Sequence, residues 1–457
     1  MAPGRKSSPA PVWPPPLPTD ESEEERKQRI RDEAEAKERN DRIDKELNAE
    51  REWRKRPRAK ILLLGQAESG KSTVLKNFQL QFAPKAFESD VDIWRPVVHL
   101  NLVRSVNFVL DFLATRFSAL RDNGSINKQY ITPELRKLCA RLAPLRQVED
   151  SLTVALTGSS ANSPFSSSYN PAKSSGLSMP TGYGWKSSLL GRRNDSPNPS
   201  GSDTSEFGQA GRILAACGED IDRLWNHSGV QELLKAADIT LEEQPGFFLD
   251  QSVRVTDENY KPLPEDVLKA RVTTVGPEEH VIQAENSGDP HAKEWVIYDV
   301  GGSRSQRAAW AQFFDDVNII IFLAPMSGFN QVLAEDESVN RLTDSLRLWQ
   351  TICSNKILAN VEFVIFLNKL DILNSKLKAG IQFSQFVTSY VDKPNETKPV
   401  AKYLLDVFVS LHQQHSPRKR KLHPHLTCAV DTRATSTVIN RVREVILVKI
   451  LSQSNVI

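Results

Sequence analysis

The chain has 457 residues, of which 39% are hydrophobic and 25% charged, a balance typical of soluble globular proteins. A net charge of +2 argues against an electrostatic attraction to nucleic acid, so no nucleic-acid partner is expected. Four scattered cysteines without metal-site or disulfide spacing, and no apolar run near the roughly 20 residues that span a bilayer, predict a cytoplasmic protein.

Two contrasting segments come first. Residues 1–19 are rich in proline, which favours an extended, disordered chain over a helix. Residues 20–56 are mostly charged, with opposite charges often three or four positions apart, and this spacing predicts a charged helix. Its few large apolar residues (Ile30, Ile43 and Leu47) leave two interpretations open, a solvated helix or a helix that docks on a partner.

From residue 57 onward, short apolar runs alternate with helical patterns, which predicts an α/β domain with a parallel sheet. The runs expected to be strands are Ile61–Leu64, Trp295–Tyr298, Asn318–Ala324, Val361–Leu367 and Leu422–Ala429. Helical patterns separate the first two runs, so we predict that an all-α domain (86–265) is inserted into the α/β domain (57–85 and 266–457). A stretch at about 151–207, rich in Ser, Gly and Pro, holds too little apolar surface to fold, and we expect disorder there.

The first predicted strand leads directly into the pattern G-x-x-x-x-G-K-[ST], followed by a helical run. Glycines in this pattern let successive backbone N–H groups point at phosphate oxygens, and the helix N-terminus adds its dipole. Lys71 is expected to reach the outer phosphates and Ser72 to ligate Mg²⁺. The predicted phosphate-binding residues are Gly65, Gln66, Ala67, Glu68, Ser69, Gly70, Lys71, Ser72 and Thr73.

Two more motifs follow predicted strands. In Asp299-Val300-Gly301-Gly302, Asp299 is expected to hold Mg²⁺ through a water, and Gly302 to offer its N–H to the γ-phosphate. In Asn368-Lys369-Leu370-Asp371, the carboxylate of Asp371 can accept two hydrogen bonds that guanine offers and adenine does not. The order of the three motifs predicts a site for GTP or GDP with Mg²⁺. A P-loop ATPase or kinase is the alternative that these base-reading residues disfavour.

Four segments together resemble the heterotrimeric G-protein α-subunit family: Glu68–Thr73, Asp266–Thr274, Asp299–Gly302 and Thr427–Thr432. The resemblance implies a Ras-like P-loop GTPase domain with an inserted all-α helical domain, and a switch that binds GDP or GTP and hydrolyses GTP. A small GTPase would lack the helical insertion. The partners that the resemblance implies are a G-protein βγ dimer, a G-protein-coupled receptor and a downstream effector.

The resemblance also assigns roles to single residues. Arg271 resembles an arginine finger supplied by the chain itself, and Glu68 resembles its ion-pair partner. Thr274 resembles the switch threonine that binds Mg²⁺ and senses the γ-phosphate. The backbone of Cys428 and Ala429 is implied to contact the guanine oxygen. Further nucleotide contacts are implied for Leu268, Lys269, Ala270, Arg271, Val272, Thr273, Thr274, Asn368 and Lys369.

The chain departs from the family pattern at several positions. Ser303 stands where the family has its catalytic glutamine, and its hydroxyl is too short to orient the attacking water. Ala67 replaces a P-loop glycine, and its methyl group is expected beside the γ-phosphate. Both changes predict slow GTP hydrolysis, with a GTP-loaded binding module that does not hydrolyse as the alternative. Ala2 replaces the glycine required for myristoylation, and the first cysteine is Cys139, so we expect only peripheral, indirect contact with the inner face of the plasma membrane.

Overall fold

The computed structural model describes residues 22–55, 59–122, 132–157, 206–272, 276–285, 294–417 and 419–453. It divides into two units, residues 1–57 and 58–457, which are described separately. The Pro-rich segment predicted at residues 1–19 lies outside the described residues.

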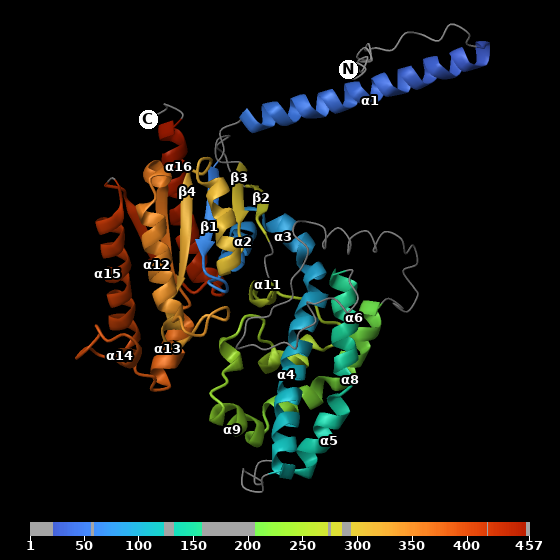
Figure 1. Cartoon of the computed structure of the whole chain (residues 1–457). Helices are drawn as coiled ribbons and strands as arrows, with labels where there is room; N and C mark the ends of the chain where they lie inside the picture. Colours follow the sequence, from blue (N-terminus) through green and yellow to red (C-terminus); the bar gives the residue numbers. More distant parts are fainter. Residues whose placement is uncertain are drawn as a thin grey trace, which may run out of the picture. The chain divides into compact units, whose positions relative to one another are not determined.

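The N-terminal unit is described as one helix, α1 (Glu23–Lys55), close to the charged helix predicted at 20–56 (Figure 1). Side chains one turn apart pair along it, as in the ion pair between Arg29 and Glu33, whose nitrogen and oxygen are 2.9 Å apart. The apolar side chains that sequence analysis singled out are about half exposed in this unit: Ile30, Ile43 and Leu47.

The second unit is built on a six-stranded sheet in the order β2-β3-β1-β4-β5-β6. Its strands are β1 (Ala59–Gly65), β2 (Glu278–Gln283), β3 (Glu294–Asp299), β4 (Ile319–Pro325), β5 (Glu362–Asn368) and β6 (Leu422–Leu426). All neighbouring pairs are parallel except β2 and β3. The five predicted runs correspond to β1 and β3–β6, but the antiparallel edge strand β2 was missed. Its sequence is mainly polar, and only Ile282 is fully buried.

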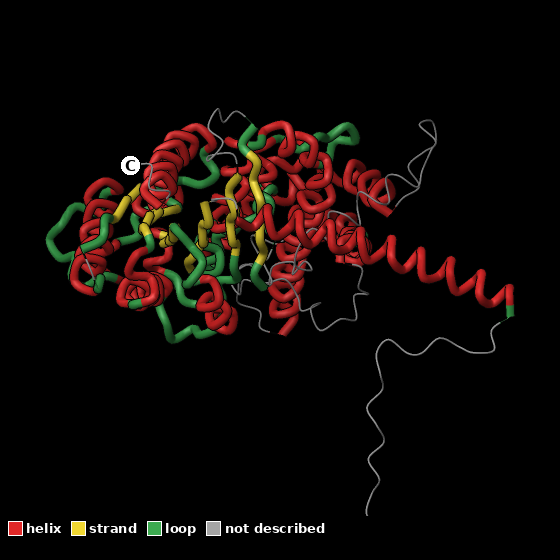
Figure 2. The backbone as a smooth tube through the Cα atoms, turned by 90° about the horizontal axis from the view of Figure 1, so that it is seen from above, coloured by secondary structure: helices red, strands yellow, loops and turns green. Residues whose placement is uncertain are grey.

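Successive residues of the strands face opposite sides of the sheet, and helices cover both sides (Figure 2). Ile61 and Leu63 of β1 pack with α2 and α16, whereas Leu62 and Leu64 pack with α12, α13 and α15. These helices are α2 (Lys71–Phe82), α12 (Arg341–Ser354), α13 (Leu370–Lys378), α15 (Thr397–His415) and α16 (Thr432–Gln453). Shorter turns connect them: η6 (Arg304–Phe313), η7 (Met326–Asn330), η8 (Ile357–Asn360) and α14 (Phe383–Phe386).

The part of the chain between α2 and β2 forms a separate hydrophobic core, and the regular elements described in this part are all helices. It runs from Phe87 to Ala270, and α4, α6 and α8 pack side by side in it (Figure 1). The helices are α3 (Pro84–Asp90), η1 (Val91–Trp94), α4 (Arg95–Asp122), α5 (Pro133–Leu142), α6 (Leu145–Thr157), α8 (Glu206–Trp225), α9 (Ser228–Ala236), η3 (Leu241–Glu243), η4 (Leu249–Gln251), α10 (Ser252–Val255) and α11 (Pro264–Lys269). The limits of the inserted domain at 86 and 265 stay a prediction.

The stretch Pro84–Ser118, which contains most of α4, is long and apolar enough by composition to cross a membrane, contrary to our reading of the sequence. Its most apolar window is 72% buried inside the fold, as expected for the central helix of a helical core. The predicted disordered stretch at 151–207 also differs at its edges. Helix α6 continues to Thr157 because Leu152 and Leu156 pack in the core, and α8 begins at Glu206. Residues 158–205 lie outside the described residues.

Candidate functional site

A cavity of about 910 Å³ opens at the carboxyl ends of the parallel strands, where ligands bind in open α/β sheets. Of the predicted site residues, eighteen line it: Ala67, Glu68, Gly70, Lys71, Ser72, Thr73, Leu268, Lys269, Ala270, Arg271, Val272, Asp299, Gly302, Ser303, Asn368, Lys369, Asp371 and Ala429. Gly65, Gln66, Ser69 and Cys428 are not among the residues that line it. Thr273 and Thr274 lie outside the described residues.

The P-loop bends tightly at Gly70, immediately before α2. Gly70 has a φ of 101°, which suits glycine, and a Cβ there would lie 2.4 Å from the Asn368 amide nitrogen. Lys71 Nζ donates hydrogen bonds to the carbonyl oxygens of Gly65 (3.1 Å) and Gln66 (2.8 Å). Burial lowers the pKa of Lys71 to about 8, partly offset by the nearby carboxylate of Asp299. A buried cation at a helix N-terminus fits an anionic ligand such as a phosphate chain.

Ser72 and Asp299 supply two oxygen groups for a cation. The Ser72 hydroxyl donates to Asp299 Oδ2 across 2.6 Å, although the residues lie on α2 and β3. Burial raises the pKa of Asp299, and the positive charge of Lys71 opposes that rise. Oxygen ligands beside a phosphate site fit Mg²⁺, which prefers oxygen. A cation here would also offset the free-energy cost of burying the charged Asp299 carboxylate. The third predicted ligand, Thr274, is not described.

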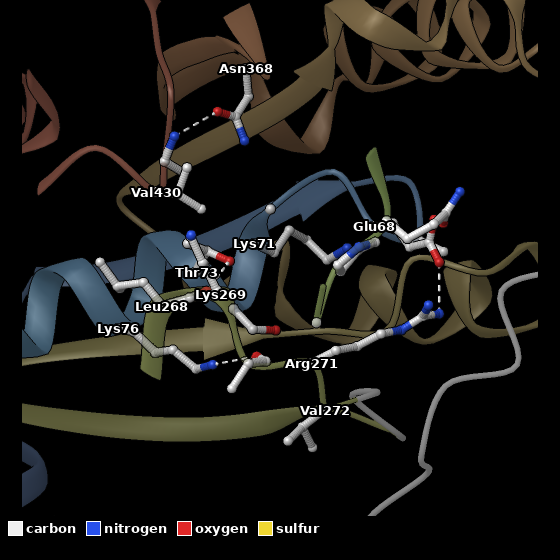
Figure 3. A pocket seen from close by; sticks show the side chains of 18 of the residues that line it. Glu68, Lys71, Thr73, Lys76, Leu268, Lys269, Arg271, Val272, Asn368 and Val430 are labelled. Atoms are coloured by element: carbon white, nitrogen blue, oxygen red, sulfur yellow. Dashed lines mark hydrogen bonds and ion pairs between the residues drawn. The ribbon is translucent and has the colours of Figure 1, made fainter. Parts of the chain in front are cut away.

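Glu68 links two arginines at the other side of the cavity. Its carboxylate lies 2.7 Å from Arg271 (Figure 3) and 3.2 Å from Arg341, and all three side chains are largely buried. Burial raises the pKa of Glu68, but the two guanidinium groups outweigh it and hold this pKa below its usual value. Glu68 has a φ of 60°, a left-handed conformation that is unfavourable for a residue with a side chain. The ion pair predicted between Glu68 and Arg271 is therefore present.

The backbone of Arg271 is held by the helical core. Its N–H donates to Asn101 Oδ1 (2.7 Å), and Asn101 Nδ2 donates to its carbonyl oxygen (3.2 Å). Lys76 of α2 also holds this segment, donating to the carbonyl oxygens of Val267 (2.8 Å) and Ala270 (3.0 Å). The segment that carries the arginine is thus fixed from two elements.

The opposite end of the cavity is organised by Asn368, which lies beside Val430 in Figure 3. Its Nδ2 donates to the Ser69 carbonyl (2.8 Å), and its Oδ1 accepts from the Ala429 N–H (3.1 Å). Asn368 therefore joins the P-loop to the loop after β6. Lys369 has a φ of 63°, and burial lowers its pKa to about 8. Asp371, two residues after Lys369, also lines the cavity and is exposed. It lies in the first turn of α13, and its carboxylate is the one predicted to recognise the base.

The turn after β3 contacts the P-loop closely. A Cβ on Gly302 would lie 2.3 Å from the carbonyl carbon of Gln66. Arg307 donates to the Gly302 carbonyl (3.2 Å) and to both carboxylate oxygens of Asp344 (3.0 and 2.7 Å). Gln66 Nε2 donates to the same carboxylate at 2.5 Å. One carboxylate on α12 therefore ties the P-loop to the segment after β3.

Ser303 immediately precedes η6, and its side chain contacts a residue of that helix. Its hydroxyl donates to Gln306 Oε1 (2.7 Å), and Gln306 also lines the cavity. Sequence analysis identified Ser303 but missed Gln306, Asn101, Arg341 and Asp344. A polar Asn101 within an apolar helix was a detectable signal, since buried polar groups need partners. Arg341 and Asp344 carry no local pattern.

A family model described as the G-protein alpha subunit matches residues 37–446. Relatives that match most of the chain include a guanine nucleotide-binding protein alpha-4 subunit of Mycosarcoma maydis, 29% identical over 94% of this chain and 92% of the relative. An alpha-2 subunit of Neurospora crassa is 27% identical over 92% of this chain and 97% of its own length. An alpha-8 subunit of Caenorhabditis briggsae is 36% identical, over 45% of this chain and 54% of the relative.

Proposed function

Because the chain belongs to the G-protein α-subunit family, we propose that it is a GDP/GTP switch whose own GTP hydrolysis is slow. Members of this family bind guanine nucleotides and are generally GTPases. The observation that carries the slow rate is the side chain after Gly302, where the hydroxyl of Ser303 is hydrogen-bonded to Gln306.

Nucleotide binding rests on residues at both ends of the cavity. Lys71 and the P-loop N–H groups would hold the phosphates, and Asp371 would accept hydrogen bonds from guanine. Ser72 and Asp299 would hold Mg²⁺, which neutralises charge on the phosphates when it is bound.

Hydrolysis would use Arg271 to stabilise charge that develops on the transferring phosphoryl group. In this class of enzyme a built-in arginine is generally credited with about 10³–10⁵ in rate. In the present structure Arg271 pairs with Glu68 across 2.7 Å, so the guanidinium has to leave or share that carboxylate to reach the phosphate. Ala67 adds a methyl group to the part of the P-loop that lies against Gly302. The closeness of the two backbones is shown by the 2.4 Å that would separate the Ala67 nitrogen from a Cβ on Gly302.

The switch itself would be the ordering of two segments by the γ-phosphate. One is the Arg271 segment, and the other follows Gly302. The second already contacts the P-loop through Gly302, and Arg307 of this segment shares the Asp344 carboxylate with Gln66 of the P-loop. A γ-phosphate that binds the Gly302 N–H would strengthen this contact, and its loss on hydrolysis would weaken it.

The first test identifies the nucleotide bound after purification and then measures single-turnover release of phosphate from preloaded GTP. We expect a bound guanosine nucleotide and slow release, and we expect Ser303→Gln to accelerate release by roughly 10²-fold, because a correctly placed water is worth about that factor. Ser384→Gln is the matched control, since Ser384 is exposed on α14 and does not line the cavity. An unchanged rate in Ser303→Gln would contradict the proposed cause of slow hydrolysis.

A second candidate is a GTP-loaded binding module without hydrolysis, which Ser303 and Ala67 both favour. Phosphate release no faster than from GTP in buffer would support it over the slow GTPase. Under either function, we propose the partners general to the family: a βγ dimer, a G-protein-coupled receptor and an effector. A cytoplasmic location with peripheral membrane contact stays a prediction.

A further inference from the structure

We propose that Gln306 supplies the carboxamide that orients the attacking water, in place of the glutamine missing at position 303. The inference rests on the proposed GTPase function and names a catalytic residue for it. It explains how a chain that keeps Arg271 retains hydrolysis without a glutamine directly after Gly302.

The start of η6 brings the side chain of residue 306 to that of residue 303. Ser303 is the N-cap of η6 and has an extended backbone, so hydrogen bonds across the start of the helix make this contact. Here the Gln306 N–H donates to the Ser303 carbonyl (3.0 Å), which closes this turn, and the two side chains meet at 2.7 Å. A glutamine three residues later therefore occupies the space above the serine, and its side chain is longer than that of serine.

The carboxamide of Gln306 lies against the turn that is expected to face the γ-phosphate. A Cβ on Gly301 would lie 2.1 Å from Gln306 Oε1 and 2.8 Å from its Nε2. Only a glycine at 301 leaves room for this side chain. The next residue, Gly302, contacts the P-loop backbone at Gln66 and Ala67. Gln306 therefore lines the cavity at its phosphate end, one residue from the predicted γ-phosphate donor.

Neighbouring polar side chains of the turn are engaged elsewhere. Arg304 pairs with Asp336 (2.7 Å), and Arg307 pairs with Asp344 (2.7 Å). Gln66, the P-loop glutamine, donates its amide to Asp344 instead of lying in the cavity lining. Gln306 lines the cavity beside the Asp299–Gly302 turn and has both the length and the chemistry to hold a water.

The reaction itself would be an ordinary hydrolysis. The water oxygen forms a bond to the γ-phosphorus while the bond from that phosphorus to the bridging oxygen breaks. GDP leaves with the electron pair, and the protons of the water pass to the released phosphate and to solvent. The Gln306 carboxamide accepts a hydrogen bond from the water and is not consumed, and the Ser303 hydroxyl holds the carboxamide oxygen in place.

The test compares Gln306→Ala with Gln312→Ala, a matched control because Gln312 is exposed on the same helical turn. Single-turnover hydrolysis is measured together with two fluorescence readouts of Trp310, whose indole donates to the Gly301 carbonyl (2.9 Å). One readout is the response to a non-hydrolysable GTP analogue, and the other is the response to GDP with aluminium fluoride, a mimic of the transferring phosphoryl group. Trp310→Phe identifies the part of each signal that belongs to this residue.

We expect Gln306→Ala to hydrolyse GTP roughly 10²-fold more slowly, to keep the response to the GTP analogue, and to lose the response to GDP with aluminium fluoride. Gly301→Ala should do the same, because its methyl group displaces the carboxamide. In the Ser303→Gln background, Gln306→Ala should have little further effect. An unchanged hydrolysis rate in Gln306→Ala would overturn the inference, and so would loss of both fluorescence responses, which indicates a structural role.

Failure of the inference and failure of the proposed function give different results. If wild-type protein binds and hydrolyses GTP and Gln306→Ala does so equally, only the role of Gln306 is refuted. If wild-type protein binds GTP without hydrolysing it, both the role of Gln306 and the proposed slow hydrolysis are refuted. The result would then support the second candidate function, a GTP-loaded binding module. If no guanosine nucleotide binds to folded protein, the proposed function fails as a whole.

Discussion

Replacing Gly302 with alanine should separate the turn after β3 from the P-loop. The added Cβ would lie 2.3 Å from the carbonyl carbon of Gln66 and 2.4 Å from the backbone nitrogen of Ala67. Favourable carbon contacts begin at about 3.5 Å, so the two backbones have to move apart by about 1 Å. The obstacle is the contact itself, because Gly302 is not among the described glycines with a positive φ.

Both backbones carry predicted phosphate ligands, so the shift should affect hydrolysis. A misplacement of about 1 Å costs on the order of 10²-fold in rate, and overpacking of this kind costs about 1–3 kcal/mol of stability. We expect Gly302→Ala to show both losses, the first by single-turnover phosphate release and the second by equilibrium denaturation with urea.

Gly211→Ala is the control for this experiment. A Cβ on Gly211 meets nothing within 4 Å, and the residue lies inside helix α8. Alanine there should leave hydrolysis unchanged and stabilise the fold by about 0.5–1 kcal/mol, because glycine is unfavourable within helices. Wild-type hydrolysis and stability in Gly302→Ala would refute the argument that this close contact transmits the nucleotide state.

Three further predictions follow from single side chains. Burial raises the pKa of Asp266, but hydrogen bonds, above all from Arg254 at 2.6 Å, lower it overall. The carboxylate therefore stabilises the fold above its unfolded pKa of about 4, and this stabilisation is lost as the pH falls through its pKa in the folded protein. Asp266→Asn should lower the free energy of unfolding by about 2 kcal/mol at pH 7, measured by urea denaturation. The difference in stability between the variant and wild type should shrink below about pH 4. Asp371→Asn should weaken GDP binding by roughly 10²-fold in calorimetry, since two charge-assisted hydrogen bonds are lost, and should improve binding of xanthosine diphosphate, whereas equal GDP affinity would contradict its role. Arg271→Ala should slow single-turnover hydrolysis by about 10³-fold with little effect on GDP affinity, and an unchanged rate would contradict the role proposed for Arg271.

The parts of the fold that could be predicted from the sequence depend on short-range patterns. Buried strands such as β1 and β5 are continuous apolar runs, and the P-loop is contiguous in the chain. Strand β2 was missed because it is a partly exposed edge strand whose pattern differs little from that of a loop. Its position is set by pairing with β3, which the local sequence does not encode.

The candidate site shows the same division. Lys71, Ser72 and Asp299 were found because each belongs to a motif with a fixed spacing. Arg341 was missed because it approaches Glu68 from a helix that follows the P-loop by hundreds of positions. Gln306 lies three residues from a recognised position, but its proposed role depends on the hydrogen bond that its side chain accepts from Ser303 at the start of η6.

The two-way hydrogen bonding between Asn101 and the backbone of Arg271 has a consequence for nucleotide exchange. Asn101 belongs to α4, the central helix of the helical core, whereas the phosphates are expected on the P-loop at the sheet. If these two bonds hold while α4 moves away from the sheet to let GDP escape, the arginine moves with α4, and the bonds from Lys76 of α2 to Val267 and Ala270 break. While the molecule is open for nucleotide exchange, Arg271 would then be too far from the phosphates to assist hydrolysis. Nucleotide exchange and GTP hydrolysis would therefore take place in different conformations.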